Sequence, residues 1–325
     1  MGSTANILKT IEQRIAALPL QREPRGLYEP IEYSMGNGGK RIRPLLTVLA
    51  CQVFDAGKIA DAYTPAIAWE MFHNFTLLHD DVMDRAPIRR GKPTVPAKYG
   101  DNTAILSGDT MLVEAFRILH QTKSDSFSKI AELFARTAQE VCEGQMYDME
   151  FEERADITEN EYIEMIRLKT SVLIGACLKT GALMGGASDD DAQLLYDFGI
   201  NLGLAFQLRD DLLDTFGNPE TFGKRIGGDI VCGKKTYLLI NALNAASAQD
   251  RATMNDWLGR AEFDEEQKIE AIRAMYVKYG IDRMSEKKIE EYDNKATQIL
   301  DKLSARGLEV SPLRELSQKL LNRDK

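Results

Sequence analysis

Residues 61–84 of the chain read DAYTPAIAWEMFHNFTLLHDDVMD, and the spacing of their apolar residues decides how the chain folds. Apolar side chains recur at intervals of three and four residues, and the segment contains neither glycine nor a run of β-branched residues. This spacing predicts an α-helix. The segment ends on three carboxylates, Asp80, Asp81 and Asp84, so the predicted helix leads from an apolar body to an acidic end.

Further segments of the chain have the same spacing, while strand-like alternation is scarce throughout. Short stretches rich in glycine, proline and aspartate separate these segments and predict turns or loops. Several predicted helices are apolar nearly all round, which is typical of buried helices. We therefore expect an all-α fold with one domain, residues 1–325, built as a single large bundle of ten or more helices. The further predicted helices span residues 42–54, 103–119, 127–152, 159–185, 190–216, 234–247, 264–280 and 283–304.

The composition narrows the class of protein. The 41 lysines and arginines against 50 aspartates and glutamates give a formal net charge of -9, which argues against a general nucleic-acid binder. The N-terminus lacks the basic-then-apolar order of a signal peptide, and no stretch offers the roughly 18 apolar residues of a membrane span. We expect a soluble, cytoplasmic protein. Neither a zinc site nor a disulfide framework is indicated by the widely spaced cysteines, Cys51, Cys142, Cys177 and Cys232.

A second acidic cluster repeats the spacing of the first. FQLRDDLLD at 206–214 contains Asp210, Asp211 and Asp214. Residues four apart share one helix face, so Asp210 and Asp214 point the same way, as the outer aspartates of the first cluster do. One such cluster could be a solvated helix end, although the helix dipole disfavours carboxylates there. Two copies favour a functional site, and their hard oxygen ligands indicate Mg²⁺ bound together with a phosphorylated ligand.

Basic residues accompany both acidic clusters and could supply the phosphate contacts. Guanidinium groups bind phosphate in a bidentate way, and lysine acts as a point charge. For any one lysine an ordinary surface position is the alternative, and for Lys235 that alternative is preferred. No P-loop spacing occurs, and with 3 histidines a His-based triad is poorly supported. The basic residues are Lys40, Arg41 and Arg43 in GNGGKRIRP, Arg89 and Arg90 after the first cluster, and Lys224, Lys234 and Lys235 after the second.

With these motifs in their order, the chain resembles the trans-isoprenyl diphosphate synthases. The motifs are GGKRIRP, LLHDDVMD, RRGKPTVP, LKTS, FQLRDDLLD and the later GK and GKKT, and the resemblance covers about residues 36 to 240. It implies a bundle of helices around a deep central cavity and a homodimer. It also implies the condensation of isopentenyl diphosphate with an allylic diphosphate, either dimethylallyl, geranyl or farnesyl diphosphate.

The resemblance further implies roles for single residues. Asp80 and Asp84 would hold two Mg²⁺ and Asp210 a third, all on the allylic diphosphate. The remaining aspartates of the clusters, Asp81, Asp211 and Asp214, would orient these ligands or bound water. The same diphosphate would contact Arg89, Lys169, Lys224 and Lys234. The diphosphate of isopentenyl diphosphate would contact Lys40, Arg43, His73 and Arg90, with a core position as the alternative for His73. Two oxygen-bearing side chains would stabilise an allylic cation, Thr170 and Gln207.

Product length depends on the residues just before the first cluster, Phe75 and Thr76. In the resembled family a bulky aromatic residue here blocks the growing tail, with two aromatics favouring a C15 product and one at the position of Phe75 favouring C20. An ordinary core phenylalanine is the alternative. We expect a C20 or C15 product and disfavour a long polyprenyl product.

Three other functions are weighed against this prediction. A terpene cyclase would share the first aspartate cluster but not FQLRDDLLD or GGKRIRP. A non-catalytic partner subunit would be expected to lack motif aspartates, and none is missing. A structural bundle with acidic helix ends does not explain why basic residues follow both clusters.

Overall fold

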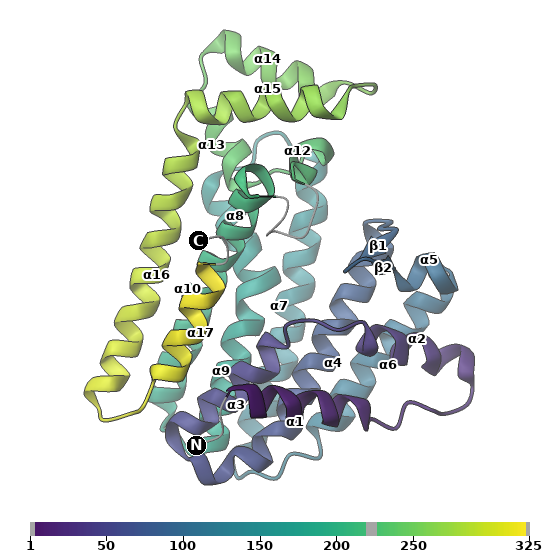
Figure 1. Ribbon diagram of the computed structural model, residues 1–325, viewed down its shortest axis with the longest axis vertical. Helices are drawn as coiled ribbons and strands as arrows, with labels where there is room; N and C mark the ends of the chain where they lie inside the picture. The colour runs from purple at the N-terminus through teal and green to yellow at the C-terminus, as the bar shows by residue number, and fades with distance from the viewer. Residues whose placement is uncertain (1–3, 219–225, 323–325) are drawn as a thin grey trace. The chain divides into compact units, whose positions relative to one another are not determined.

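The computed structural model describes residues 4–218 and 226–322, and nearly all of their regular structure is helical (Figure 1). In these ranges, strand structure is confined to the two-stranded antiparallel hairpin of β1 (Ile88–Arg89) and β2 (Lys92–Pro93). The prediction of an all-α fold with ten or more helices is confirmed. None of the helices in the described ranges is long and apolar enough to cross a membrane.

The chain divides into two compact units. Unit 1 comprises Met1–Phe134 and Cys177–Gln193, and unit 2 comprises Ala135–Ala176 and Leu194–Lys325. The unit boundaries fall inside three helices, α7 (Phe127–Glu153), α9 (Val172–Gly185) and α10 (Asp189–Phe216). The prediction of one domain stays a prediction.

Unit 1 is built around the long helix α4 (Ile59–Met83), which packs against α3 (Ile42–Phe54) and α6 (Asp101–Leu119). Its core contains Trp69, whose Nε1 donates a hydrogen bond of 3.0 Å to Thr180 of α9. A Cβ at Gly181 would lie 2.0 Å from the Thr47 carbonyl oxygen, so glycine is required for α9 to approach α3. The other elements of this unit are α1 (Thr4–Ala16), α2 (Arg25–Gly36), η1 (Ala56–Lys58) and α5 (Val95–Tyr99).

In unit 2 a π-helical turn, η2 (Arg167–Ser171), packs closely against α7 and α10. A Cβ at Gly144 of α7 would lie 2.3 Å from the Lys169 backbone nitrogen, and one at Gly203 of α10 would lie 2.6 Å from Ser171 Cα. The predicted helix over 159–185 is helical throughout, and at η2 its α-helical geometry changes to π-helical between α8 (Glu159–Ile166) and α9. The remaining elements are α12 (Gly228–Cys232), α13 (Tyr237–Ala245), α14 (Ala248–Gly259), α15 (Glu265–Lys278), α16 (Ile281–Ala305) and α17 (Ser311–Leu321).

Candidate active site

The first aspartate cluster lies at the C-terminal end of α4 in unit 1. Asp81 is buried, 4% exposed, and its Oδ1 accepts a hydrogen bond of 2.7 Å from Arg89 Nε. Burial raises the pKa of Asp81, and the nearby Arg89 guanidinium counteracts this shift. Asp80 is half-buried and Asp84 is exposed, so the two predicted metal ligands are the more accessible members of the cluster.

The hairpin after the first cluster carries Arg89 and Arg90 into the neighbourhood of the glycine turn. Arg90 donates a hydrogen bond to the Gly38 carbonyl oxygen. Gly39 has φ +134°, a backbone conformation that favours glycine, and a Cβ there would lie 2.8 Å from Arg90 Nη1. The Asp81 carboxylate and both arginines line one small cavity with Asn37. The predicted grouping of acidic and basic residues is thus present within unit 1.

Arg43 and His73 form a hydrogen-bonded pair in unit 1. Arg43 Nη1 lies 3.1 Å from His73 Nε2. Burial lowers the pKa of His73 well below its ordinary value, and the Arg43 charge lowers it further. The imidazole is therefore neutral, accepts from Arg43 at Nε2 and carries its proton on Nδ1. Arg43 Nε is buried and has no hydrogen-bond partner among the described residues, as expected of a group that binds an anion. Lys40 is exposed nearby in sequence.

Arg41 does not belong with the phosphate-binding residues, where its sequence position had placed it. It is 3% exposed and precedes α3 as its N-cap residue, with φ 48°. Its Nη1 donates to Glu70 and its Nε to Glu12, each at 2.8 Å. A left-handed backbone conformation turns this side chain inward, so Arg41 is a buried ion-pair residue that ties α1, α3 and α4 together.

Phe75 lies in a buried aromatic cluster. Its ring centroid is 5.6 Å from that of Phe72 and 4.8 Å from the His79 ring, and the side chain is 8% exposed. Thr76 donates its hydroxyl to the His73 carbonyl oxygen of the same helix at 2.8 Å. The roles of Phe75 and Thr76 in product length stay predictions.

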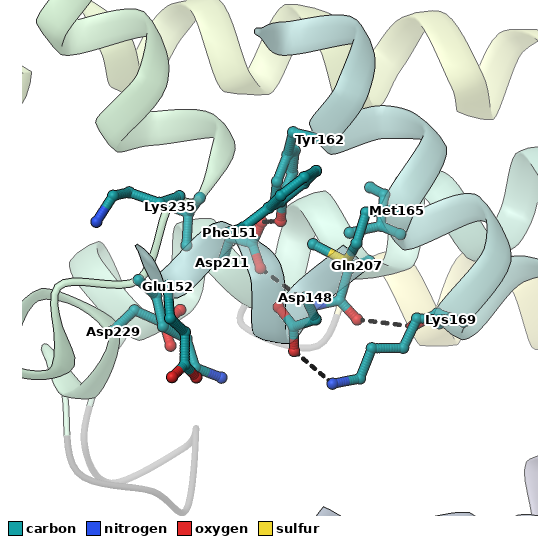
Figure 2. A pocket seen from close by; sticks show the side chains of 14 residues that line it. Asp148, Phe151, Glu152, Tyr162, Met165, Lys169, Gln207, Asp211, Asp229 and Lys235 are labelled. Atoms are coloured by element: carbon teal, nitrogen blue, oxygen red, sulfur yellow. Dashed lines mark hydrogen bonds and ion pairs between the residues drawn. The ribbon is translucent and has the colours of Figure 1, made fainter. Parts of the chain in front are cut away.

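Unit 2 contains a cavity of about 170 Å³ that is lined by charged, polar and apolar side chains (Figure 2). Lys169 and Thr170 come from the π-helical turn, and Gln207 comes from α10. The predicted cation-stabilising pair is joined by a hydrogen bond of 3.3 Å from Thr170 Oγ1 to Gln207 Oε1. Phe151, Met165 and Ile166 supply an apolar part of the wall.

Lysines from two segments of the chain line this cavity, Lys169 from η2 and Lys234 and Lys235 from the loop before α13. Lys169 Nζ lies 2.5 Å from Asp148 Oδ2, so an acid that sequence reasoning missed holds the predicted phosphate ligand. Lys234 and Lys235 both line the cavity. The ordinary surface position preferred for Lys235 stays a prediction. Lys235 donates to the Gly233 carbonyl oxygen at 3.2 Å. Lys224 lies outside the described residues.

The second aspartate cluster lies on α10, with its middle member buried. Asp211 is 4% exposed and accepts hydrogen bonds from the Tyr162 hydroxyl and, at 3.1 Å, from Gln207 Nε2. Burial raises the pKa of Asp211, and the charge of Asp229 raises it further. Asp210 and Asp214 are half-buried.

Asp214 and Asp229 connect the second cluster to the loop that carries the lysines. Asp214 Oδ2 accepts from the Asp229 backbone N–H at 2.9 Å. Asp214 thereby fixes a backbone segment five residues before Lys234. Sequence reasoning missed Asp148, Tyr162 and Asp229, because nothing in the spacing of these residues distinguishes them from ordinary helix or loop residues.

The carboxylates suit a magnesium ion that takes part of its coordination from elsewhere. In residues 4–218 and 226–322, no three histidine, cysteine or acidic side chains are arranged to hold a metal by themselves. Mg²⁺ commonly binds one or two protein carboxylates together with waters and substrate phosphates. The accessible outer aspartates of each cluster fit this mode of binding.

Comparison with known proteins agrees with the motifs. Residues 24–276 match the family model described as polyprenyl synthetase. The chain is 41% identical over 260 residues to a geranylgeranyl diphosphate synthase of Methanosarcina mazei, covering 79% of this chain and 78% of that protein. It is 36% identical over 320 residues to a geranylgeranyl pyrophosphate synthase of Geoglobus acetivorans, covering 97% of both chains. A crystal structure of a geranylgeranyl pyrophosphate synthase superposes with a TM-score of 0.92 at 41% identity, over 100% of both chains.

Proposed function

The chain belongs to the polyprenyl synthetase family, and we propose from this that it is a trans-prenyltransferase that condenses isopentenyl diphosphate with an allylic diphosphate. The observation that carries the proposal is the cavity of unit 2, where lysines, carboxylates and uncharged oxygen atoms line one apolar-walled space. The lysines suit a diphosphate and the apolar wall suits a prenyl chain. The two relatives from Methanosarcina mazei and Geoglobus acetivorans are named as geranylgeranyl synthases, which supports a C20 product.

We propose that Asp80, Asp84 and Asp210 bind Mg²⁺, with three ions per site, and that Asp81, Asp211 and Asp214 orient these ligands. When bound, Mg²⁺ neutralises the leaving diphosphate and so makes it a better leaving group. The accessibility of the outer aspartates supports this assignment. In Asp81 and Asp214, at least one carboxylate oxygen is already engaged by Arg89 or by the loop backbone.

Lys169, Lys234 and Arg89 are proposed to bind the allylic diphosphate, together with Lys224. The Asp148 carboxylate holds Lys169 at the cavity, which restricts the rotamers of this long side chain before substrate binds. As the C–O bond of the allylic substrate breaks, these cations stabilise the negative charge that gathers on the diphosphate. The departed diphosphate is the base that removes the final proton, so no histidine base is needed.

We propose that Lys40, Arg43, His73 and Arg90 bind the diphosphate of isopentenyl diphosphate. The unpartnered Arg43 Nε and the Arg90 contact with the glycine turn support this proposal. The neutral His73 can donate its Nδ1 proton to an anion while it accepts from Arg43.

The test is to incubate the protein with isopentenyl diphosphate, Mg²⁺ and dimethylallyl, geranyl or farnesyl diphosphate, and to identify the products by mass. The expected product is geranylgeranyl diphosphate. A C15 product would place the limit of elongation one unit earlier, and much longer chains would favour a long-chain polyprenyl synthase. Cyclised hydrocarbons would identify a terpene cyclase, and no turnover would leave a non-catalytic subunit.

We further propose a homodimer in the cytoplasm, since the resemblance implies a dimer. Sedimentation velocity at micromolar concentration measures the oligomeric state, and cell fractionation measures the location in the cell. A monomer that retains full turnover would contradict the dimer as the functional form.

A further inference from the structure

Tyr162 belongs to none of the motifs, yet it contacts the centre of the second aspartate cluster. It lies on α8, is 3% exposed and lines the cavity of unit 2. Its hydroxyl donates a hydrogen bond to Asp211 Oδ2, as Figure 2 shows. A buried tyrosine hydroxyl needs a hydrogen-bond partner. Here that partner is a carboxylate that also accepts a hydrogen bond from a second side chain.

The second side chain is Gln207, and Asp211 decides which way its amide group points. Asp211 Oδ1 accepts from Gln207 Nε2 at 3.1 Å. A carboxylate oxygen that faces an N–H group can only accept, so it selects the nitrogen end of the amide and rejects the oxygen end.

The orientation of Gln207 determines the orientation of Thr170 in turn. With its nitrogen directed to Asp211, Gln207 directs Oε1 toward Thr170, whose hydroxyl donates to it at 3.3 Å. This bond uses the only hydrogen of the hydroxyl. The lone pairs of Thr170 Oγ1 that remain are then available to the cavity, as is part of Gln207 Oε1.

Two oxygen atoms without free hydrogens suit a developing carbocation. A cation on carbon is stabilised by the negative ends of fixed dipoles, and dipoles that are already oriented need no reorganisation during the reaction. A reversed Gln207 amide would instead direct its positive NH₂ group toward Thr170. The sign of the dipoles at the reacting carbons therefore depends on the hydrogen bonds of Asp211.

We propose that Tyr162 is a positioning residue for the ionisation step: by holding the Asp211 carboxyl group, it sets the orientation of Gln207 and Thr170. This inference rests on the proposed prenyl transfer, in which an allylic cation forms beside these two residues. Without the tyrosine hydroxyl, the carboxyl group keeps one side-chain partner of the two and can rotate, so the amide is no longer held in one orientation.

The first test is Tyr162→Phe, which removes the hydroxyl and keeps the ring. We expect kcat to fall about tenfold, while KM for either diphosphate changes less than about twofold, because the phosphate-binding residues are untouched. The matched control is Tyr237→Phe, another buried tyrosine of unit 2, which does not line the cavity; its kcat should stay within about twofold of wild type. An unchanged kcat in Tyr162→Phe would overturn the inference. So would equal losses in both variants, because they would indicate general loosening.

The second test is a double-mutant cycle with Gln207→Leu. If Tyr162 acts through Gln207, then adding Tyr162→Phe to Gln207→Leu should lower the residual kcat by less than about twofold. A further tenfold loss would mean that the tyrosine acts independently of the amide and would overturn the inference. Wild-type protein assayed in parallel separates this failure from failure of the proposed function, since an inactive wild type contradicts prenyl transfer itself.

Discussion

The two aspartate clusters have the same spacing in sequence, but the buried carboxylates of their middle residues have different hydrogen-bond partners. Asp81 is buried against a guanidinium group, and Asp211 is buried against a phenol hydroxyl and an amide. An ion pair compensates a buried charge directly, whereas neutral donors compensate it only in part, and Asp229 adds repulsion. Identical motifs therefore supply one charge-paired carboxylate and one carboxylate that organises neutral dipoles.

The largest expected effect is one that the two clusters share. Asp80→Ala and Asp210→Ala should each lower kcat by more than about a hundredfold, since each removes a proposed metal ligand. Steady-state assays over a Mg²⁺ titration measure this, with circular dichroism to check the helical fold. Asp125→Ala, an exposed acid elsewhere in unit 1, is the control and should be fully active. Turnover at the wild-type rate in either cluster variant would contradict the metal assignment.

Asparagine substitutions should separate the clusters. In Asp81→Asn the amide oxygen can still accept from Arg89, so we expect kcat to fall about threefold. Tyr162 and Gln207 donate to different oxygens of Asp211, and Asp211→Asn replaces one of these oxygens by an NH₂ group that cannot accept. A buried donor left unpaired costs about 1–3 kcal/mol, so we expect a loss of roughly tenfold or more. Parallel measurements of kcat in the two variants test whether these losses differ. Equal losses would show that the difference in partners has no consequence for turnover.

The aromatic cluster before Asp80 is proposed to control product length, a role that has no counterpart at the second aspartate cluster. Phe75→Ala should shift the product toward chains of C25 or longer, because it removes the side chain proposed to stop the growing tail. Mass spectrometry of the products measures the distribution. Phe116→Ala, which removes an exposed phenylalanine of α6, should leave it unchanged. The same distribution in both variants would make Phe75 an ordinary core residue.

The smallest expected effect concerns the stability of the fold and comes from His73 in unit 1. The pKa of His73 is lowered in the folded state, so below pH of about 6.5 the unfolded chain binds a proton that the folded chain refuses. Stability is therefore lost as the pH falls from that value toward the folded-state pKa. Urea unfolding at pH 7.5 and 5.5 should show a loss about 1 kcal/mol smaller in His73→Gln than in wild type. Identical pH dependence in the two proteins would contradict a neutral His73 in the folded state.

Much of the helical architecture follows from periodicity alone. The predicted helix 42–54 coincides with α3, and the predicted helix 61–84 differs from α4 by two residues at its start and one at its end. Sequence reasoning did not predict α1, α2, α14 and α17. The apolar residues of α14 are not concentrated on one face, but α1 and α17 each bury an apolar face and were missed as well. Spacing therefore predicted most of the long helices and missed several short ones.

The sequence by itself determined the aspartate clusters, most of the basic residues and the family, because these depend on short-range order along the chain. Tertiary structure decided which cations have a carboxylate partner within the chain: Arg41 pairs with Glu70, Lys169 with Asp148, and Arg89 with Asp81. Tertiary structure also decided the partners of Asp211, since Tyr162 lies 49 residues away in sequence. Burial and hydrogen bonding depend on segments that are distant in sequence, so no local pattern could have distinguished the charge-paired carboxylate from the one that orients dipoles.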